Sequence, residues 1–333
     1  MFIQRNLVLF LVCLLIFGFL CSLAFNSQKG KIEIPNDWCD KSLRPGLKKL
    51  KEIKTSRPWF KVYDVGHNTY AIDEPYNWEE TIGYLILGKE KALLFDSGMG
   101  LDSISPLIRE ITQLPIIVLN SHTHPDHIGG NYEFNHILAL NTPFTRQNAK
   151  KGYKHEEVNW EISPASFCLK RLLKMDTAHY YIKPFKVTQF IEDGYVIQLG
   201  SRSLKVIATP GHTPDALCLL DKKSGYLWCG DSFYEGPILL SSDVTDLKAY
   251  QKSIKRMADL ASVSIRILPA HNLPIANPSL IIQAAKDFDK IALGLKKALP
   301  GENHTSIFDC GTFSYQISNK FLKSLNSNKL KEY

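Results

Sequence analysis

Three histidines and an aspartate lie within six consecutive positions, in the run His122-Thr123-His124-Pro125-Asp126-His127. Neutral imidazole and carboxylate groups are ligands of zinc, iron and manganese. Alternation along an extended backbone places His122 and His124 on the same side, and a short turn then presents Asp126 and His127. Because core packing does not require imidazoles at this spacing, the run indicates half of a two-metal site rather than a polar loop.

Three later segments supply further ligands, each at the end of an apolar run and next to a turn residue. The apolar runs 204–208, 226–229 and 265–268 are followed by His212, Asp231 and His271. Each run has the length and composition of a strand that delivers one side chain from its end. The sequence therefore predicts that separated loops meet at one edge of a sheet and complete the metal site.

With these ligands in this order, the chain resembles the metallo-β-lactamase superfamily, whose pattern is HxHxDH followed by a histidine, an acidic residue and a last histidine. The resemblance covers about residues 60–317 and implies a four-layer αββα sandwich of the α/β (α+β) class. Asp96, in the turn 93–98, is expected to support the ligands without binding a metal. The resemblance implies as ligands of the first metal His122, His124 and His212, as ligands of the second Asp126, His127 and His271, and as bridge Asp231.

Within the superfamily, the segments 211–215, 230–234 and 268–272 resemble most the branch of metallo-β-lactamase domain-containing protein 2, which is acyl-CoA thioesterase-like, and the glyoxalase II-type hydrolases. This implies hydrolysis of an ester-like bond, foremost a thioester of coenzyme A or glutathione. True β-lactamases usually hold cysteine or serine where Asp231 stands. The alternatives are a lactonase, a β-lactamase-like amidase or a phosphodiesterase. A flavodiiron-type oxidoreductase, with glutamate in place of His124, and a non-catalytic metal-binding protein are the non-hydrolase alternatives.

The expected cofactors are two divalent ions, zinc foremost, with iron or manganese as alternatives. Such ions lower the pKa of a water held between them, so that hydroxide, and not a serine or cysteine, is the expected nucleophile. Asp231 would share both ions, and Asp126 would orient the hydroxide or accept its proton. Asp126 and Asp231 are therefore the candidate catalytic residues.

The N-terminal residues have a different composition. Arg5 precedes an apolar stretch, residues 7–25, that contains no charge. Such a stretch is typical of a signal peptide or a membrane anchor, and Ser22-Leu23-Ala24 is a suitable cleavage site. We therefore expect an exported or membrane-anchored protein, which contacts the membrane through residues 7–25 if they are not cleaved. Four basic residues between positions 29 and 44 follow the stretch, so the positive-inside rule leaves a cytosol-facing anchored enzyme as the alternative.

Length and composition allow one catalytic domain beside this element, since 44% of the 333 residues are hydrophobic. We expect a linker over 26–58, the hydrolase domain over 59–318 with a pocket-shaping insertion over 142–190, and a basic tail over 319–333. The formal charge of +7 favours an anionic substrate or an anionic membrane face, and the resemblance implies a small-molecule substrate that is anionic or acyl-bearing. No basic patch interleaved with aromatic residues is present, so nucleic-acid binding is not expected.

Periodicity predicts the elements that must position the ligands. Strands over 61–65, 70–72, 82–87 and 92–95 should form an antiparallel meander, followed by a helix capped by Asp102 and by the strand 116–119 that leads to the histidine run. Strands over 195–199, 204–208, 216–220 and 226–229 should form a second sheet, covered by helices over 247–261 and 278–299.

Two questions stay open at this level. The first concerns six aromatic residues of the insertion, namely Tyr153, Trp160, Phe167, Tyr180, Tyr181 and Phe185. They either line an acyl-binding surface or pack the insertion onto the domain. Among the cysteines, Cys218 and Cys229 are expected in the core, and a Cys39–Cys310 disulfide is one option.

Overall fold

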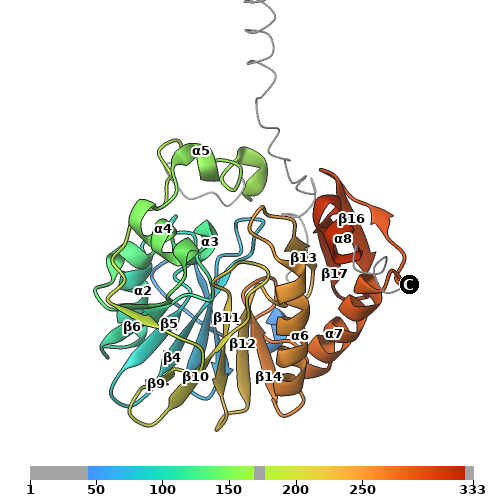
Figure 1. Ribbon diagram of the computed structural model, residues 1–333. Helices are drawn as coiled ribbons and strands as arrows, with labels where there is room; N and C mark the ends of the chain where they lie inside the picture. The colour runs from blue at the N-terminus through green and yellow to red at the C-terminus, as the bar shows by residue number, and fades with distance from the viewer. Residues whose placement is uncertain (1–43, 169–176, 327–333) are drawn as a thin grey trace, which may run out of the picture. The chain divides into compact units, whose positions relative to one another are not determined.

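Two β-sheets lie face to face between helices in the computed structural model, which describes residues 44–168 and 177–326 (Figure 1). The apolar stretch 7–25, with the predicted cleavage site Ser22-Leu23-Ala24, falls outside these residues. Within the described part of the chain, no helix combines the length and apolar character needed to cross a membrane.

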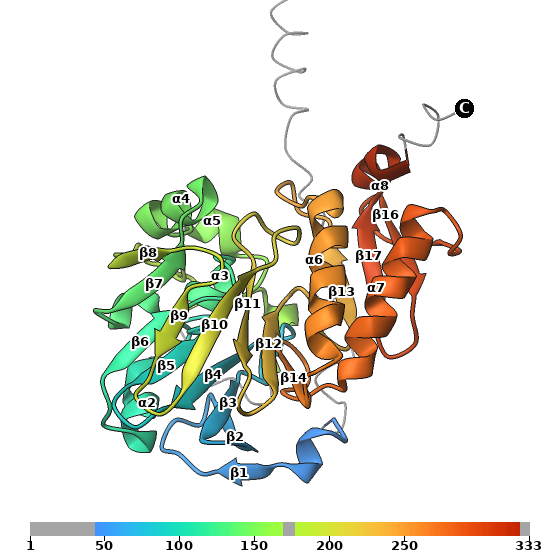
Figure 2. The ribbon, with the colours of Figure 1, turned by 60° about the horizontal axis from the view of Figure 1, so that its bottom comes forward.

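The first sheet has eight strands that follow one another in chain order. Its antiparallel part consists of β1 (Lys51–Ile53), β2 (Lys61–Gly66), β3 (Thr69–Asp73), β4 (Ile82–Leu87) and β5 (Ala92–Phe95). Its parallel part adds β6 (Ile116–Leu119), β7 (Ile137–Leu140) and β8 (Gln189–Ile191) after the crossover helix α2 (Ile104–Ile111). The predicted meander is present, but β1 lies inside the predicted linker and pairs with β2, at the edge visible in Figure 2.

The second sheet has the order β14-β12-β11-β10-β9. The strands β9 (Val196–Gln198), β10 (Ser203–Ala208), β11 (Leu217–Asp221) and β12 (Tyr226–Gly230) are antiparallel, and β14 (Arg266–Pro269) pairs with β12 in parallel. The helices α6 (Leu247–Ala261) and α7 (Pro278–Ala292) cover this sheet on the side away from the first (Figure 1). The second helix ends at Ala292, before the predicted end at 299.

Three clusters of buried side chains fill the layers and hold them together. One lies between the two sheets and includes Phe95, Leu119 and Trp228. A second joins the outer face of the first sheet to α2 through residues such as Leu107 and Ile108. Since a fully buried aliphatic or aromatic side chain contributes about 1.5–3 kcal/mol, these contacts fix the αββα order that was predicted.

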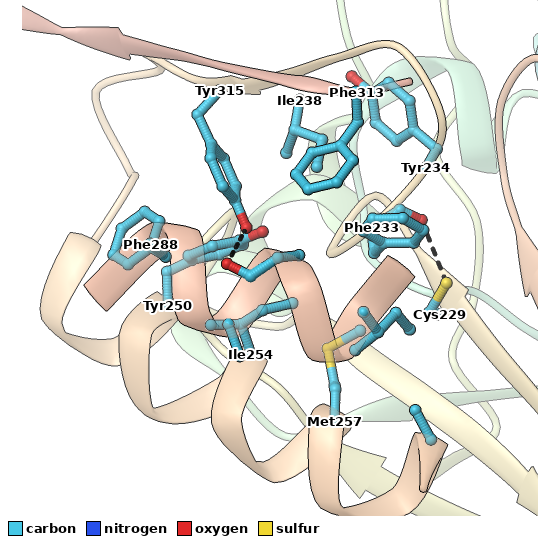
Figure 3. Close-up of a cluster of buried hydrophobic side chains, with 14 of the residues drawn as sticks. Cys229, Phe233, Tyr234, Ile238, Tyr250, Ile254, Met257, Phe288, Phe313 and Tyr315 are labelled. Carbon is cyan, nitrogen blue, oxygen red and sulfur yellow. Dashed lines mark hydrogen bonds between the residues drawn. The ribbon is translucent and has the colours of Figure 1, made fainter. Parts of the chain in front are cut away.

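The third cluster joins the second sheet to α6, α7 and a C-terminal sheet (Figure 3). Tyr250, Phe288 and Tyr315 pack at its centre, with ring centroids 4.9–5.9 Å apart. The C-terminal sheet has the order β13-β17-β16-β15, with strands β13 (Pro237–Leu240), β15 (Leu299–Pro300), β16 (Thr305–Asp309) and β17 (Ser314–Ser318). This sheet is an addition to the two that were predicted.

The prediction of a basic tail over 319–333 is corrected, because the first part of this segment is the helix α8 (Asn319–Asn326). Phe321, Leu322 and Leu325 are partly buried and pack against the third cluster. The apolar residues that lie among the lysines therefore attach this segment to the folded domain.

The insertion holds α4 (Pro143–Lys151), α5 (His155–Val158) and the 3₁₀ turn η4 (Pro164–Ser166). Phe167 and Tyr180 are buried in the second cluster, and Tyr153 and Phe185 pack against it, whereas Trp160 and Tyr181 are exposed. Four of these six aromatic residues therefore pack the insertion onto the domain, which was one of the two alternatives.

The start of α2 also differs from the prediction. Asp102 does not cap this helix; instead Oε1 and Oε2 of Glu133 accept hydrogen bonds from the backbone N–H groups of Ile104 and Ser105, at 3.2 and 2.9 Å. Glu133 belongs to the turn η3 (Asn131–Glu133), and the remaining short elements are η2 (Leu47–Lys49) and α3 (Pro125–Ile128). The cap comes from a residue close in space rather than adjacent in sequence.

Candidate metal centre

All seven predicted ligand residues meet at one end of the paired sheets. His122 and His124 follow β6, and Asp126 and His127 lie in α3, which Pro125 begins at its first turn. The other three lie within four residues of the ends of β10, β12 and β14, namely His212, Asp231 and His271. Their ligand atoms form three overlapping groups, in each of which all atoms lie within 4.8 Å of one another.

The first group consists of three imidazoles whose nitrogens face one another. Nδ1 of His124 lies 3.0 Å from Nε2 of His122 and 3.1 Å from Nε2 of His212. Burial lowers the pKa of His122 well below its usual range and that of His124 to about 3, which keeps both rings neutral. Ligands of a tetrahedral zinc ion are about 3.3 Å apart, so three neutral nitrogens at this spacing fit a cation.

The second group consists of Asp126, His127 and His271. Oδ2 of Asp126 lies 3.0 Å from Nε2 of His127 and 3.6 Å from Nε2 of His271. Burial opposes protonation of His271, but the nearby carboxylates, Asp231 first, raise its pKa to about 9. His127 behaves in the same way, since burial is outweighed by Asp126, Asp231 and Asp96 and its pKa lies well above the usual value. This half of the centre therefore favours positive charge.

Asp231 lies between the groups and turns one carboxylate oxygen to each. Its Oδ2 lies 3.8 Å from Nε2 of His122 and 3.6 Å from Nε2 of His212. Its Oδ1 lies 3.3 Å from Nε2 of His127 and 3.1 Å from Nε2 of His271. Oδ1 of Asp231 and Nε2 of His127 are both buried, and neither has a hydrogen-bond partner of acceptable geometry. Buried polar atoms without such partners fit a site for a cation on each side of the Asp231 carboxylate.

The far nitrogens of the rings are fixed by neighbouring groups. Nδ1 of His212 is 2.9 Å from the carbonyl oxygen of Leu239 in β13, and Nδ1 of His271 is 2.7 Å from that of Glu79. An Nδ1–H donated to these carbonyls leaves the Nε2 lone pair directed into the centre. Asp96 contacts a candidate ligand from behind, as expected from the sequence. Its Oδ2 lies 3.1 Å from Nδ1 of His127, and its Oδ1 accepts a hydrogen bond from the N–H of Ser121 at 2.6 Å.

One buried carboxylate was missed from the sequence. Asp215 accepts hydrogen bonds from the hydroxyls of Thr123 at 2.6 Å, Thr213 at 2.7 Å and Thr145 at 3.0 Å. Thr123 lies between His122 and His124, and Thr213 follows His212, so Asp215 joins the two loops of the first group. The threonine beside each loop's histidines is the signal that could have indicated this role.

A family model described as Metallo-beta-lactamase superfamily matches residues 83–294. The fold and the order of the site residues agree with this match, and the chain belongs to the metallo-β-lactamase superfamily of hydrolases. The superfamily typically binds divalent metals, and the histidine and aspartate groups of this chain are suited to them.

Relatives at modest identity carry hydrolase names. The chain is 25% identical over 226 residues to "Acyl-coenzyme A thioesterase MBLAC2" of Gallus gallus, which covers 64% of this chain and 80% of the relative. The Homo sapiens protein of the same name is 24% identical over 229 residues, covering 64% and 81%. A hydroxyacylglutathione hydrolase of Francisella tularensis subsp. novicida is 28% identical over 104 residues, covering 31% and 41%.

Solved structures share the fold at low identity. A double mutant of a sec-alkyl sulfatase aligns with a TM-score of 0.57 and 15% identity, covering 82% of this chain and 50% of the sulfatase. A metallo-β-lactamase from Erythrobacter litoralis aligns with a TM-score of 0.50 and 13% identity, covering 72% and 100%. These structures support the sandwich architecture.

Proposed function

We propose that the chain is a dinuclear metal-dependent thioesterase that hydrolyses acyl thioesters of coenzyme A or glutathione. The observation that carries the proposal is the position of Asp231, whose two oxygens each face one group of ligand atoms. The names of the relatives, a thioesterase and a hydroxyacylglutathione hydrolase, support a thioester as the substrate.

In this proposal, one ion would be held by His122, His124 and His212, and the other by Asp126, His127 and His271. Asp231 would contribute to both. Bound divalent ions, zinc foremost, would supply an acidified water and polarise the substrate carbonyl. The carboxylate of Asp126 accepts a hydrogen bond from the hydroxyl of Thr81 at 3.3 Å, which orients it. Asp126 would take the proton of the attacking water, while a thiolate leaving group needs little protonation.

The free cysteines of the described residues are poor nucleophiles, which supports water in that role. Cys218, Cys229 and Cys310 are free and buried. Burial raises the pKa of the Cys218 thiol to about 12 and that of Cys310 to about 11, and it holds that of Cys229 well above its usual value. Because the thiolate is the reactive form, these residues belong to the core and not to the reaction.

The test is a hydrolysis panel on the metal-loaded full chain. It compares an acyl-CoA series, S-lactoylglutathione, a homoserine lactone, nitrocefin and bis-p-nitrophenyl phosphate. We expect kcat/KM for one thioester class to exceed the other classes by at least about tenfold, which is about 1.4 kcal/mol in the activation free energy. Chelator-treated protein is the control. A lactone, β-lactam or phosphodiester that is cleaved faster than every thioester would refute the proposal.

We also propose that the chain is exported or anchored through residues 7–25. Cys168 is disulfide-bonded, and disulfides persist in oxidising compartments. Cys310 is a free thiol, so the option of a Cys39–Cys310 disulfide is wrong. Peptide mass spectrometry of protein alkylated without reduction should recover Cys168 in a cross-linked peptide from the native source. Recovery of alkylated Cys168 alone would contradict export.

A further inference from the structure

The guanidinium of Arg44 joins two backbone segments that lie far apart in sequence. Its Nε donates a hydrogen bond to Oε2 of Glu80 at 2.7 Å, and its Nη2 contacts the same oxygen. Nη2 also donates to Oδ1 of Asn272 at 2.6 Å. Arg44 therefore connects the loop before β4 to the loop after β14.

His271 lies between these two segments and is held by both. Its Nδ1 is 2.7 Å from the carbonyl oxygen of Glu79, and its backbone forms an antiparallel bridge with Thr81. On either side of that bridge, Asn272 N–H donates to the carbonyl of Glu80 at 3.2 Å and Ile82 N–H to that of Ala270 at 2.6 Å. This short ladder fixes the direction in which the imidazole points.

The ladder includes two residues in the left-handed region, Glu80 with φ +45° and Asn272 with φ +66°. Asparagine tolerates this conformation, whereas glutamate does so at a cost that the surroundings must offset. Arg44 contacts the side chains of both residues. The other end of the Asn272 amide, Nδ2, donates to the carbonyl of Glu235 at 2.9 Å, so the loop is held from two sides.

We propose that Arg44 is a positioning residue for His271 and thus for the second metal subsite. It acts from a segment that precedes residues 83–294, the part of the chain matched by the family. This inference rests on the metal centre of the proposed function, but it does not depend on which substrate is cleaved.

The loops of the first metal subsite are held by a different set of hydrogen bonds, so the two subsites can be compared within one protein. Asp215 joins Thr123 and Thr213, beside the three histidines of that subsite. Among the described residues, it makes no hydrogen bond or ion pair with Arg44, Glu80 or Asn272. Loss of Arg44 should therefore weaken one metal equivalent, and Asp215→Asn should weaken the other.

The experiment measures zinc binding by the full chain in competition with a chromophoric chelator, together with the visible spectrum of the cobalt-loaded protein. We expect Arg44→Ala to weaken the second equivalent by about 10- to 100-fold and to leave the first unchanged, the range found when groups behind metal ligands are removed. Arg44→Lys should restore part of the affinity, because an ammonium can still reach one of the two acceptors. Glu80→Gln, which keeps the size of the side chain, should shift affinity in the same direction.

Arg256→Ala is the matched control. The side chain of Arg256 is 43% exposed, compared with 42% for Arg44, and it pairs with Asp193 at 2.9 Å and donates to the carbonyl of Ala208 at 3.0 Å. We expect both zinc equivalents of this variant to bind as in the wild type. Thermal unfolding of the metal-free variants checks that each one folds.

A double-mutant cycle separates positioning from general loosening of the fold. In a His271→Ala background, Arg44→Ala should have no further effect on zinc affinity, because the side chain that it positions is gone. Unchanged affinity for both equivalents in Arg44→Ala, or an equal loss with and without His271, overturns the inference. A wild-type chain that binds fewer than two ions overturns it together with the proposed function. Two bound ions without thioester cleavage overturn the proposed function alone.

Discussion

At the residue scale, the centre is organised around one carboxylate. Asp231 faces His122 and His212 through Oδ2 and His127 and His271 through Oδ1. Nearby histidines, His271 first, hold the pKa of the buried Asp231 well below its usual range even though burial opposes ionisation. An anion shared in this way couples the two halves of the site electrostatically.

This geometry predicts different outcomes for two substitutions. Asp231→Asn removes the shared charge, so zinc analysis should show both equivalents weakened. The value of kcat/KM should fall by at least about 100-fold, which is the largest effect usual for groups that contact metal ligands without binding the metal. His271→Ala should weaken one equivalent, which stays measurable at higher zinc concentration, and leave the other unchanged. The exposed Asp193→Asn is the control. If Asp231→Asn retained two tightly bound ions, the bridging role would be wrong.

At the element scale, contacts distant in sequence complete the local structure. The α2 N-terminus illustrates this, since Glu133 accepts from two of its N–H groups and also from the hydroxyl of Ser103 at 2.6 Å. A carboxylate at this position satisfies N–H groups that would otherwise lack partners, and it complements the helix dipole. The helix carries Leu107 and Ile108 onto the sheet, so its start affects the packing of the second cluster.

Glu133→Ala should therefore lower the free energy of unfolding by about 0.5–2 kcal/mol, the range for loss of an N-cap. Urea denaturation followed by circular dichroism measures the change. Glu192→Ala, on an exposed position, is the control and should leave stability unchanged within about 0.5 kcal/mol. Equal stabilities of the two variants would show that Glu133 does not cap α2.

The same contrast explains which features could be predicted from the sequence. The convergence of the seven candidate ligand residues, the meander and the layers were predictable, because a local run of ligand residue types and short apolar periods indicate them. Arg44 and Glu133 could not be found in this way, since their partners lie 228 and about 30 positions away and become neighbours only in the fold. The third sheet was missed because β13 and its partner β17 are short and separated by the whole of α6 and α7.

At the scale of the whole molecule, the C-terminal sheet and α8 extend the sandwich beyond its two central sheets. The cluster that they share with α6 and α7 includes buried Tyr250, Phe288 and Tyr315 (Figure 3). Phe321, Leu322 and Leu325 of α8 cover part of it. The helix therefore contributes to the stability of the domain.

Leu322→Ala tests this contribution. Because the side chain is partly buried, we expect a loss of about 1–2 kcal/mol in the free energy of unfolding, less than for a fully buried leucine. Lys323→Ala, one position further along and exposed, should have little effect. Thermal or urea unfolding provides the measurement, and a Leu322→Ala protein as stable as Lys323→Ala would restore the idea of a solvated tail.

The pairing of β13 with β17 also sets the order in which the chain can mature. Leu239 of β13 accepts the hydrogen bond from His212, and β13 is an edge strand whose neighbour is β17, completed at Ser318. During synthesis, all seven candidate ligand residues emerge before this last strand does. We therefore expect metal loading to be a post-translational event, since the nascent chain lacks the support that orients one of its imidazoles.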